Sequence, residues 1–322
     1  MIELPTAKNE SRVTNDESRM TVLLADIGGT NTRLAVVRDG ALSPVFAYRN
    51  ADFSSFASVA AAYLKQQRIR PARFFLAIAG VVSPMQRIYK LTNHPWTFDT
   101  AKLQRQFHLS DCVIVNDFEA SGYALARLKP ADAICLYPGK KSRYAPCLVI
   151  GPGTGLGACC VVSDGEKWRV LPTEAGHTTL SSYPVFPTSR RLCAEDILSG
   201  RGLAFIYKKL TRTAKKPEDI YRLAAGGDKN ARKAYDIFGA FLGDFAGNMA
   251  VIFQSFGGVY FSGALLGAPF VWDWLRKSDF HAHFVDRNKL APAMQKIPIF
   301  MMRAATPALD GLHYLASLEK NT

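Results

Sequence analysis

The sequence predicts an α/β protein whose strands are covered by helices on both faces of a sheet. Its apolar runs, such as Phe74 to Ala79 and Cys112 to Val115, lack the polar alternation of half-buried strands. Segments with helical spacing separate these runs, a pattern typical of buried sheets in α/β proteins. The chain has 322 residues and is 48% hydrophobic, which is enough to bury a large core in two lobes.

The first half of the chain predicts strands joined by turns and interrupted by two helices. Apolar side chains at helical spacing run from Phe56 to Leu64, and a second helix-like segment covers Thr100 to Phe107. The remaining apolar runs are predicted as strands: Val22 to Ile27, Arg33 to Val37, Val45 to Arg49, Phe74 to Ala79 and Cys112 to Val115.

A second round of the same pattern begins at Cys147, and each round opens with a glycine-rich hairpin, which is a weak internal repeat. In a long predicted helix Gly239, Gly243 and Gly247 recur every four residues, so we expect a neighbouring element to approach it closely. The predicted elements are strands over Cys147 to Gly151, Gly157 to Val162, Trp168 to Leu171, Gly258 to Ser262 and Ile297 to Met301, and helices around Ala194 to Leu210 and Lys233 to Ser255.

Composition and charge exclude several classes of protein. Residues 1–19 are polar, lack the apolar run of a secretion signal and predict a flexible extension. No segment reaches the roughly 20 uninterrupted apolar residues of a membrane span, so we expect no membrane partner. The six cysteines lack disulfide spacing, which predicts free thiols in a cytoplasmic protein. The net charge of +13 is dispersed without a basic arm or interleaved aromatic residues, so we expect no nucleic-acid partner.

The first glycine-rich hairpin, Asp26 to Asn31, is a candidate phosphate-binding turn. Gly28 and Gly29 carry no side chain, so their backbone N–H groups can close on a phosphate, and the Thr30 hydroxyl can add a hydrogen bond. Asp26 ends a buried strand, where an ionised carboxylate needs a cation or hydrogen bonds. A Mg²⁺ ion accompanying ATP would answer that need, often through water. For this segment alone, an ordinary hairpin is the alternative.

The second hairpin, Gly151 to Gly157, contains four glycines in seven residues. It is not the dinucleotide fingerprint, because a strand follows it instead of a helix. It is not a Walker A loop either, because no Gly-Lys-Ser/Thr occurs at the required spacing. A flexible turn is one interpretation, but glycines between strands indicate close backbone approach to another group.

Polar side chains that could bind a hydroxylated ligand lie in three further segments. Asn116 and Asp117 come directly after a strand and lead into a helix, the position at which open α/β sheets bind ligands. Either residue could instead cap that helix. Glu174 and His177 follow another strand, and Glu195 lies near the start of a predicted helix.

Seven motifs, taken in order, resemble those of the bacterial glucokinase family. The motifs are Asp26-Ile-Gly-Gly-Thr-Asn, Thr92-Asn-His-Pro-Trp-Thr-Phe, Asn116-Asp-Phe, Gly153-Thr-Gly-Leu-Gly, Glu174-Ala-Gly-His, Ala194-Glu-Asp-Ile-Leu-Ser-Gly and Phe256-Gly-Gly-Val-Tyr. The resemblance implies a hexokinase/actin-like ATPase fold with two RNase H-like lobes and the active site in the interlobe cleft. It implies a small lobe over residues 20–115, completed by a C-terminal helix over 303–322, and a large lobe over residues 116–302.

The same resemblance implies an ATP-dependent glucokinase, with glucose and ATP as partners and Mg²⁺ as cofactor. Asp117 would accept the proton of the sugar 6-hydroxyl, while the other hydroxyls would be held by Asn116, Glu174, His177 and Glu195. The residues implied to bind ATP and its phosphates are Asp26, Gly28, Gly29, Thr30, Asn31, Gly153, Thr154, Gly155 and Gly263, with Asp26 holding Mg²⁺ through water. A homodimer is compatible with this resemblance.

The segment 178–194 departs from the family pattern. It looks shorter than in typical bacterial glucokinases and carries Pro184 and Pro187 in place of a long helix. Because it borders the implied sugar pocket, a kinase for another hexose, such as mannose, fructose or an amino sugar, is an alternative. The positive charge leaves a second alternative of another class, a non-catalytic nucleic-acid- or protein-binding module on the same fold.

Overall fold

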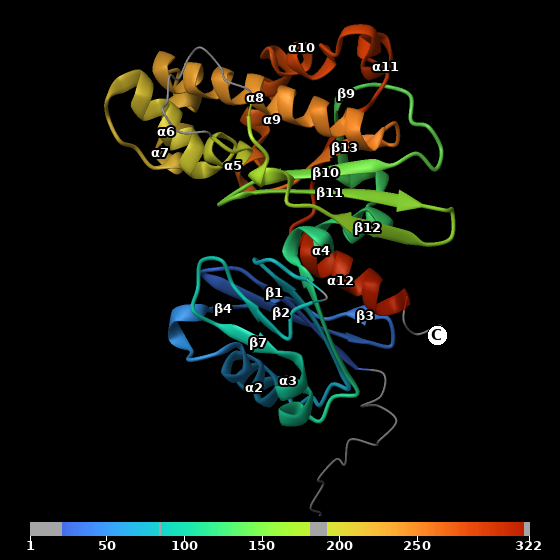
Figure 1. The fold of residues 1–322 in the computed structure, drawn as a ribbon. Coiled ribbons are helices and arrows are strands. Elements are labelled where there is room, and N and C mark those ends of the chain that lie inside the picture. The colour runs from blue at the N-terminus through green and yellow to red at the C-terminus, as the bar shows by residue number, and fades with distance from the viewer. Residues whose placement is uncertain (1–20, 84, 181–191, 319–322) are drawn as a thin grey trace, which may run out of the picture. The chain divides into compact units, whose positions relative to one another are not determined.

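The computed structural model describes residues 21–83, 85–180 and 192–318. The chain divides into two units, the first ending at Asp117 and the second running from Phe118 to Leu318 (Figure 1). Both units combine helices with a six-stranded sheet, so the predicted α/β class is confirmed. The predicted extension over residues 1–19 and most of the departing segment 178–194 lie outside the described residues.

The first unit has the strand order β3-β2-β1-β5-β8, and β4 also pairs with β2. Strands β1, β5 and β8 are parallel, and Ile27, Ile78 and Asn116 lie in register at their carboxyl ends. The β1–β2 hairpin therefore turns at the edge where β8 ends. The strands are β1 (Val22–Ile27), β2 (Asn31–Arg38), β3 (Ala41–Leu42), β4 (Phe46–Arg49), β5 (Arg73–Ile78) and β8 (Asp111–Asn116).

Two helices of the first unit pack on one face of this sheet. Phe56 and Tyr63 of the first helix share a buried cluster with Leu23 and Phe74 of the strands. Ser55 caps this helix by accepting a hydrogen bond from the Ser58 N–H, as is common at helix N-termini. The remaining elements of the first unit are η1 (Asn50–Asp52), α2 (Phe56–Gln67), the two-stranded ribbon of β6 (Ile88–Lys90) and β7 (Thr97–Asp99), and α3 (Thr100–Phe107).

The second unit repeats this plan with the strand order β12-β11-β10-β13-β14-β9. Strand β10 is antiparallel to β11 and parallel to β13, as β1 is antiparallel to β2 and parallel to β5. The internal repeat predicted from the two hairpins is therefore confirmed. The strands are β9 (Ala133–Tyr137), β10 (Cys147–Pro152), β11 (Leu156–Ser163), β12 (Trp168–Pro172), β13 (Gly258–Phe261) and β14 (Ile299–Met302).

Helices cover both faces of the second sheet. Figure 1 shows α5 to α11 on one face and α4 with α12 on the other. The predicted helical segment 194–210 is divided in two, because buried Ser199 caps a new helix. The helices are α4 (Asp117–Tyr123), η2 (Ala124–Arg127), η3 (Pro130–Asp132), η4 (Ala175–His177), α5 (Ala194–Ile197), α6 (Gly200–Thr211), α7 (Pro217–Ala225), α8 (Lys229–Phe253), η5 (Ala264–Leu266), α9 (Pro269–Lys277), α10 (Phe280–Val285), η6 (Asn288–Leu290), α11 (Ala291–Met294) and α12 (Pro307–Leu318).

The C-terminal helix α12 packs on the second unit. It contacts η2, and Gly311 lies so close to the Ala120 carbonyl that a Cβ atom would not fit there. These contacts group residues 307–318 with the second unit. The lobe boundaries implied by the resemblance, with a helix over 303–322 completing the small lobe, stay a prediction. The missing side chain at Gly311 is what allows the close approach.

The long helix α8 is a core element. It is the one helix within the described ranges whose length and composition would allow it to cross a membrane, and 67% of its most apolar window is buried inside the protein. Gly239 lies against the Trp274 ring, and Gly243 and Gly247 lie against the backbone of Phe280 and Phe284. The close approach predicted from the three glycines is confirmed.

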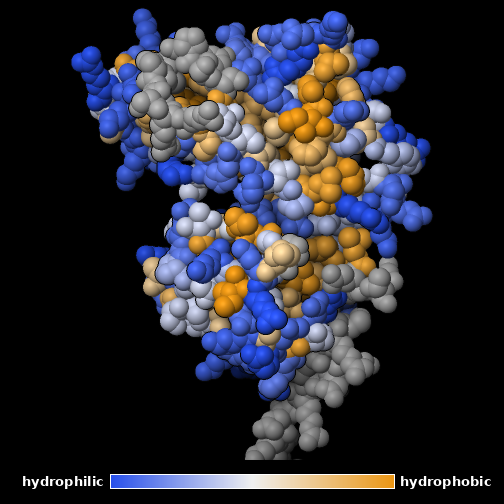
Figure 2. Space-filling model, viewed as in Figure 1, coloured by the Kyte–Doolittle hydropathy of each residue, from blue (hydrophilic) through white to orange (hydrophobic). Residues whose placement is uncertain are grey.

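The surface and the thiols also match the composition. Hydrophilic residues predominate on the face shown in Figure 2, with orange patches between them. Exposed apolar side chains such as Met85 and Ile252 come from both units, as is normal on a globular surface. All six cysteines are free thiols, as predicted, although Cys135 is exposed and Cys193 half-buried.

Replacing Gly243 with alanine is expected to destabilise the protein, although glycine to alanine normally stabilises a helix interior by about 1 kcal/mol. The new Cβ atom would meet the Phe280 carbonyl, and such overpacking costs about 1 to 3 kcal/mol. Thermal unfolding measures the change. Asn248→Ala is the control, because Asn248 is exposed on the same helix and its replacement should leave stability unchanged or slightly higher. A Gly243→Ala protein as stable as wild type would contradict the close packing.

Candidate active site

The β1–β2 hairpin places the predicted phosphate-binding residues at the carboxyl edge of the first sheet. The Gly28 N–H donates a hydrogen bond of 3.0 Å to the Asn31 carbonyl, which closes the turn. Gly28 and Gly29 are half-buried, whereas Thr30 and Asn31 are exposed. Asn93, from the loop before β7, lies against Gly29, so a side chain at position 29 would crowd this loop.

Asn50 holds this hairpin in place by hydrogen bonds. The sequence did not indicate this role. Its side chain is 1% exposed, donates to the Gly28 carbonyl at 2.8 Å and accepts from the Thr32 hydroxyl at 2.8 Å. Its own N–H donates to the Thr30 carbonyl at 2.9 Å. A buried amide bonded in this way fixes the hairpin, because any loss would leave a buried polar group unpaired.

Asp26 is paired across the hairpin with Arg33. The two residues are register partners on β1 and β2, and Arg33 Nη1 donates to Asp26 Oδ2 at 3.0 Å. Burial raises the pKa of Asp26 above its ordinary value, and the neighbouring Arg33 guanidinium opposes this rise. The sequence predicted that this carboxylate needs a cation, and Arg33 supplies one from within the chain.

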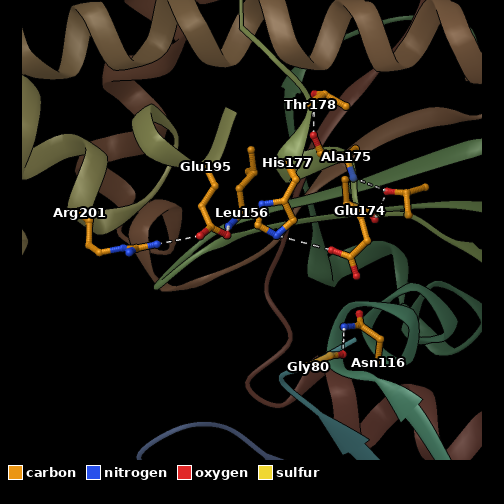
Figure 3. A network of polar contacts seen from close by, with 11 residues as sticks. Gly80, Asn116, Leu156, Glu174, Ala175, His177, Thr178, Glu195 and Arg201 are labelled. Atoms are coloured by element: carbon orange, nitrogen blue, oxygen red, sulfur yellow. Dashed lines mark hydrogen bonds and ion pairs between the residues drawn. The ribbon is translucent and has the colours of Figure 1, made fainter. Parts of the chain in front are cut away.

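Asn116 and Asp117 lie at the carboxyl end of β8, at the same edge as the first hairpin. Asn116 Nδ2 donates to the Gly80 carbonyl at 3.0 Å, which orients the amide (Figure 3). Asp117 begins α4 and is half-buried. The first unit therefore brings the predicted base and the predicted phosphate hairpin to one edge of one sheet, the usual ligand position in open α/β sheets.

The β10–β11 hairpin of the second unit is packed against Phe118, the residue that follows Asp117. A Cβ atom at either Gly151 or Gly157 would overlap the Phe118 ring. The Cys159 thiol donates to the Phe118 carbonyl at 3.4 Å. The glycines of this hairpin were expected to allow close approach of another group, and for these two positions that group is the Phe118 ring.

Glu195 is bound directly to the same hairpin (Figure 3). Glu195 Oε2 accepts a hydrogen bond of 3.0 Å from the Leu156 N–H, and Glu195 Oε1 accepts one of 2.7 Å from Arg201 Nη2. A Cβ atom at Gly155 would collide with this carboxylate. The predicted sugar residue Glu195 and the predicted phosphate residue Gly155 are therefore neighbours, which their separation in the sequence did not reveal.

Glu174 and His177 lie on the other side of Leu156. The turn η4 packs so closely on this hairpin that a Cβ atom at Gly176 would meet the Leu156 carbonyl. His177 Nε2 lies 3.8 Å from Glu174 Oε2, and both side chains are exposed. The Ala194 N–H donates to the Thr178 carbonyl at 2.9 Å, which links η4 to the start of α5.

Three further predicted residues complete the surroundings of the second hairpin. Gly153 is half-buried and Thr154 exposed at its tip. Gly263 has φ +103°, a value that favours glycine, and a Cβ atom there would lie 2.7 Å from the Pro152 carbonyl. The structure thus gathers the predicted residues into two groups, one at the edge of each sheet.

The Gly157→Ala substitution is expected to destabilise the protein by about 1 to 3 kcal/mol, because the Phe118 ring would have to move. Gly153→Ala is the matched control in the same hairpin, since nothing lies within 4 Å of the Cβ position there. Thermal unfolding of both variants checks the difference. Equal melting temperatures for the two would contradict the proposed tight packing of Phe118.

Asp26→Asn is expected to stabilise the protein near neutral pH. Because burial raises the folded-state pKa of Asp26 above 3.8, the wild type loses stability as the pH rises from 3.8 towards the raised pKa. Below this window both side chains are neutral, so the difference between the two proteins should vanish. Urea unfolding from about pH 3 to pH 8 measures it, with Asp39→Asn in an exposed turn as control. An Asn variant less stable than wild type at neutral pH would show that the Arg33 pair outweighs burial.

Comparison with known proteins gives the same family over nearly the whole chain. Residues 23–319 match the glucokinase family. The glucokinase of Tolumonas auensis is 32% identical over 308 residues, covering 90% of this chain and 95% of the relative. The solved glucokinase from an Antarctic psychrotroph has a TM-score of 0.80 at 27% identity, covering 94% of this chain and 99% of that chain. The glucokinase of Balamuthia mandrillaris, solved in complex with glucose, has a TM-score of 0.79 at 23% identity, covering 95% of each chain.

The agreement extends from sequence to fold. The repeated hairpin-plus-parallel-strand plan of the two units is that of the hexokinase/actin-like ATPase fold. The match covers the hairpins, the Asn116-Asp117 pair and the residues around Leu156. The chain therefore belongs to the glucokinase family, whose members are ATP-dependent hexose kinases that phosphorylate glucose.

Proposed function

We propose that Asp117 is the catalytic base of this glucokinase. The observation that carries the proposal is the register of the first sheet, which brings Asp117 to the edge where the Asp26 hairpin turns. A base at this edge shares it with a turn whose two glycines leave room for a phosphate to approach the backbone. The Phe118 ring packs on the paired Gly151 and Gly157, which limits the freedom of the residue before it.

In the proposed reaction the Asp117 carboxylate takes the proton of the sugar 6-hydroxyl as that oxygen attacks the γ-phosphorus of ATP. The bond between the γ-phosphorus and the β–γ bridging oxygen breaks, and its electron pair leaves with ADP. Glucose 6-phosphate is the second product. Most of the catalysis in such a reaction is positioning and charge stabilisation, which the two glycine hairpins can supply.

The other sugar hydroxyls are assigned to four side chains. The hydrogen bond to the Gly80 carbonyl orients the Asn116 amide, which we assign to one of the sugar hydroxyls. Glu174 and His177 are exposed and can reach a ligand. Glu195 keeps acceptor capacity, because each carboxylate oxygen can accept more than one hydrogen bond.

Asp26 is the residue that we propose to hold Mg²⁺, through water. Arg33 occupies Oδ2, which leaves Oδ1 for the water shell of a hydrated cation. Mg²⁺ in kinases is bound by one or two carboxylates together with substrate phosphates. Residues 21–83, 85–180 and 192–318 contain no group of three or more His, Cys, Asp or Glu side chains that could hold a metal. When bound, the ion neutralises charge on the β- and γ-phosphates.

ATP and its phosphates are assigned to the two hairpins and to Gly263. The backbones of Gly28, Gly29, Gly153 and Gly155 are assigned to the phosphates because glycine adds no side chain of its own, and nothing lies within 4 Å of the Cβ position of Gly153. The exposed Thr30, Asn31 and Thr154 side chains can add hydrogen bonds. We further propose a cytoplasmic enzyme, since its free thiols suit a reducing compartment, and a homodimer remains a prediction.

Asp117→Asn is expected to lower kcat for glucose by about 10²- to 10⁴-fold, the contribution of a general base. Thermal unfolding should change little, because the replacement is nearly isosteric. Asp111→Asn at the other end of β8 is the control and should retain activity. Turnover unaffected by Asp117→Asn in a coupled assay would disprove the assigned base.

The same assay with glucose, mannose, fructose and glucosamine tests the sugar. We expect the highest kcat/KM for glucose, because the matched relatives are glucokinases. A higher kcat/KM for another hexose would replace glucose as the substrate and leave the role of Asp117 intact.

A further inference from the structure

We propose that Arg201 is a specificity-determining residue that orients Glu195 and shares a sugar hydroxyl with it. This inference rests on the proposed role of Glu195 in sugar binding. Arg201 Nη2 holds Glu195 Oε1 at 2.7 Å while the Leu156 N–H holds Oε2 at 3.0 Å (Figure 3). With a partner on each oxygen, the carboxylate can neither rotate nor withdraw without losing a hydrogen bond.

The backbone around Arg201 is fixed by the break between α5 and α6. Ser199 is fully buried and caps α6 by accepting from the Gly202 N–H at 3.2 Å. Gly202 packs against the Ile197 carbonyl, where a Cβ atom would not fit. The Gly200 N–H donates to the Gly153 carbonyl at 2.8 Å. The residues on both sides of Arg201 are therefore held by α5 and by the glycine hairpin.

The Arg201–Glu195 pair differs from two other exposed arginine–carboxylate pairs in the described part of the second unit. Arg222 and Arg276 bind carboxylates three residues away on the same helix, and those carboxylates are 43% and 68% exposed. Glu195 is only 21% exposed and lies on a different helix from Arg201. Exposed pairs within one helix contribute little, whereas a partly buried carboxylate with a backbone partner is held more firmly.

The pair can recognise one sugar hydroxyl both as a hydrogen-bond donor and as an acceptor. A guanidinium has five N–H donors, so Arg201 can bind Glu195 and still donate to a ligand oxygen. A sugar hydroxyl beside the pair can donate its proton to Glu195 Oε1 and accept a hydrogen bond from Arg201. A sugar lacking that hydroxyl would leave both groups without a ligand partner, and sites of this kind reject such analogues strongly.

The test compares Arg201→Ala with Arg222→Ala, whose side chain is equally exposed, at 76% against 74% for Arg201. We expect Arg201→Ala to raise the KM for glucose about tenfold, as for loss of a hydrogen bond to a charged group, with little change in kcat or in the KM for ATP. Arg222→Ala should match wild type in all three values. Thermal unfolding of both variants verifies that the fold is intact.

Deoxyglucoses distinguish a role in specificity from a purely structural one, because a structural role would change the kinetics for all the sugars alike. Across 1-deoxy-, 2-deoxy- and 3-deoxyglucose, Arg201→Ala should shrink the penalty for one missing hydroxyl and leave the other penalties unchanged. Glu195→Gln should shrink the same penalty. Adding Arg201→Ala to Glu195→Gln should cause less than the product of the two single effects, because both side chains serve one hydroxyl. Arg201→Lys, which keeps the charge but loses the planar fork, should restore only part of the glucose affinity.

Two outcomes would overturn the inference, and they differ in what they leave standing. If Arg201→Ala behaves like Arg222→Ala while Glu195→Gln still weakens glucose binding, Arg201 has no part in specificity and the proposed function stands. If Glu195→Gln leaves the KM for glucose unchanged, the sugar role of Glu195 fails and the role of Arg201 fails with it.

Discussion

The arrangement of the second unit depends on one constraint, the absence of side chains at the glycine positions of the β10–β11 hairpin. The Phe118 ring occupies the space that Cβ atoms at Gly151 and Gly157 would need, and the Glu195 carboxylate occupies the space beside Gly155. The same hairpin presents the Leu156 N–H to Glu195. The glycines of this hairpin thus determine where Phe118 and Glu195, a predicted sugar-binding residue, can lie.

The first unit secures its hairpin by a different device. There the buried side chain of Asn50 forms hydrogen bonds with the Gly28 carbonyl and the Thr32 hydroxyl. Arg33 on the neighbouring strand forms an ion pair with Asp26. Polar bonds of this kind fix a turn and leave Gly28 and Gly29 half-buried. The two hairpins occupy equivalent places in the repeated fold, but the second is held mainly by packing and the first mainly by hydrogen bonds.

Much of the fold was predictable because the parallel strands are uninterrupted apolar runs and the hairpins are marked by glycine. Strand β9 was not predicted, since it is a short, partly exposed edge strand whose partner, β14, lies far along the chain. The candidate residues of the site came from motifs, and the structure shows how they are held. Asn50 could not be predicted as a support, because its partner Gly28 is a backbone carbonyl on another strand. The role of Arg201 was not predictable for a similar reason. Its contact with Glu195 depends on the break between α5 and α6 at Ser199.

The position of α12 has a consequence for how the chain folds during synthesis. The described residues of the first unit, 21–83 and 85–117, come from one N-terminal segment of the chain, which is made first and can fold first. The second unit begins at α4 and η2, yet these elements are covered by α12, which is made almost two hundred residues later. Until then Ala120 and Tyr123 lack the cover that Gly311 and Tyr314 of α12 give them, and exposed apolar surfaces are the ones that chaperones bind. Closing α12 over them is the step that ends this exposure.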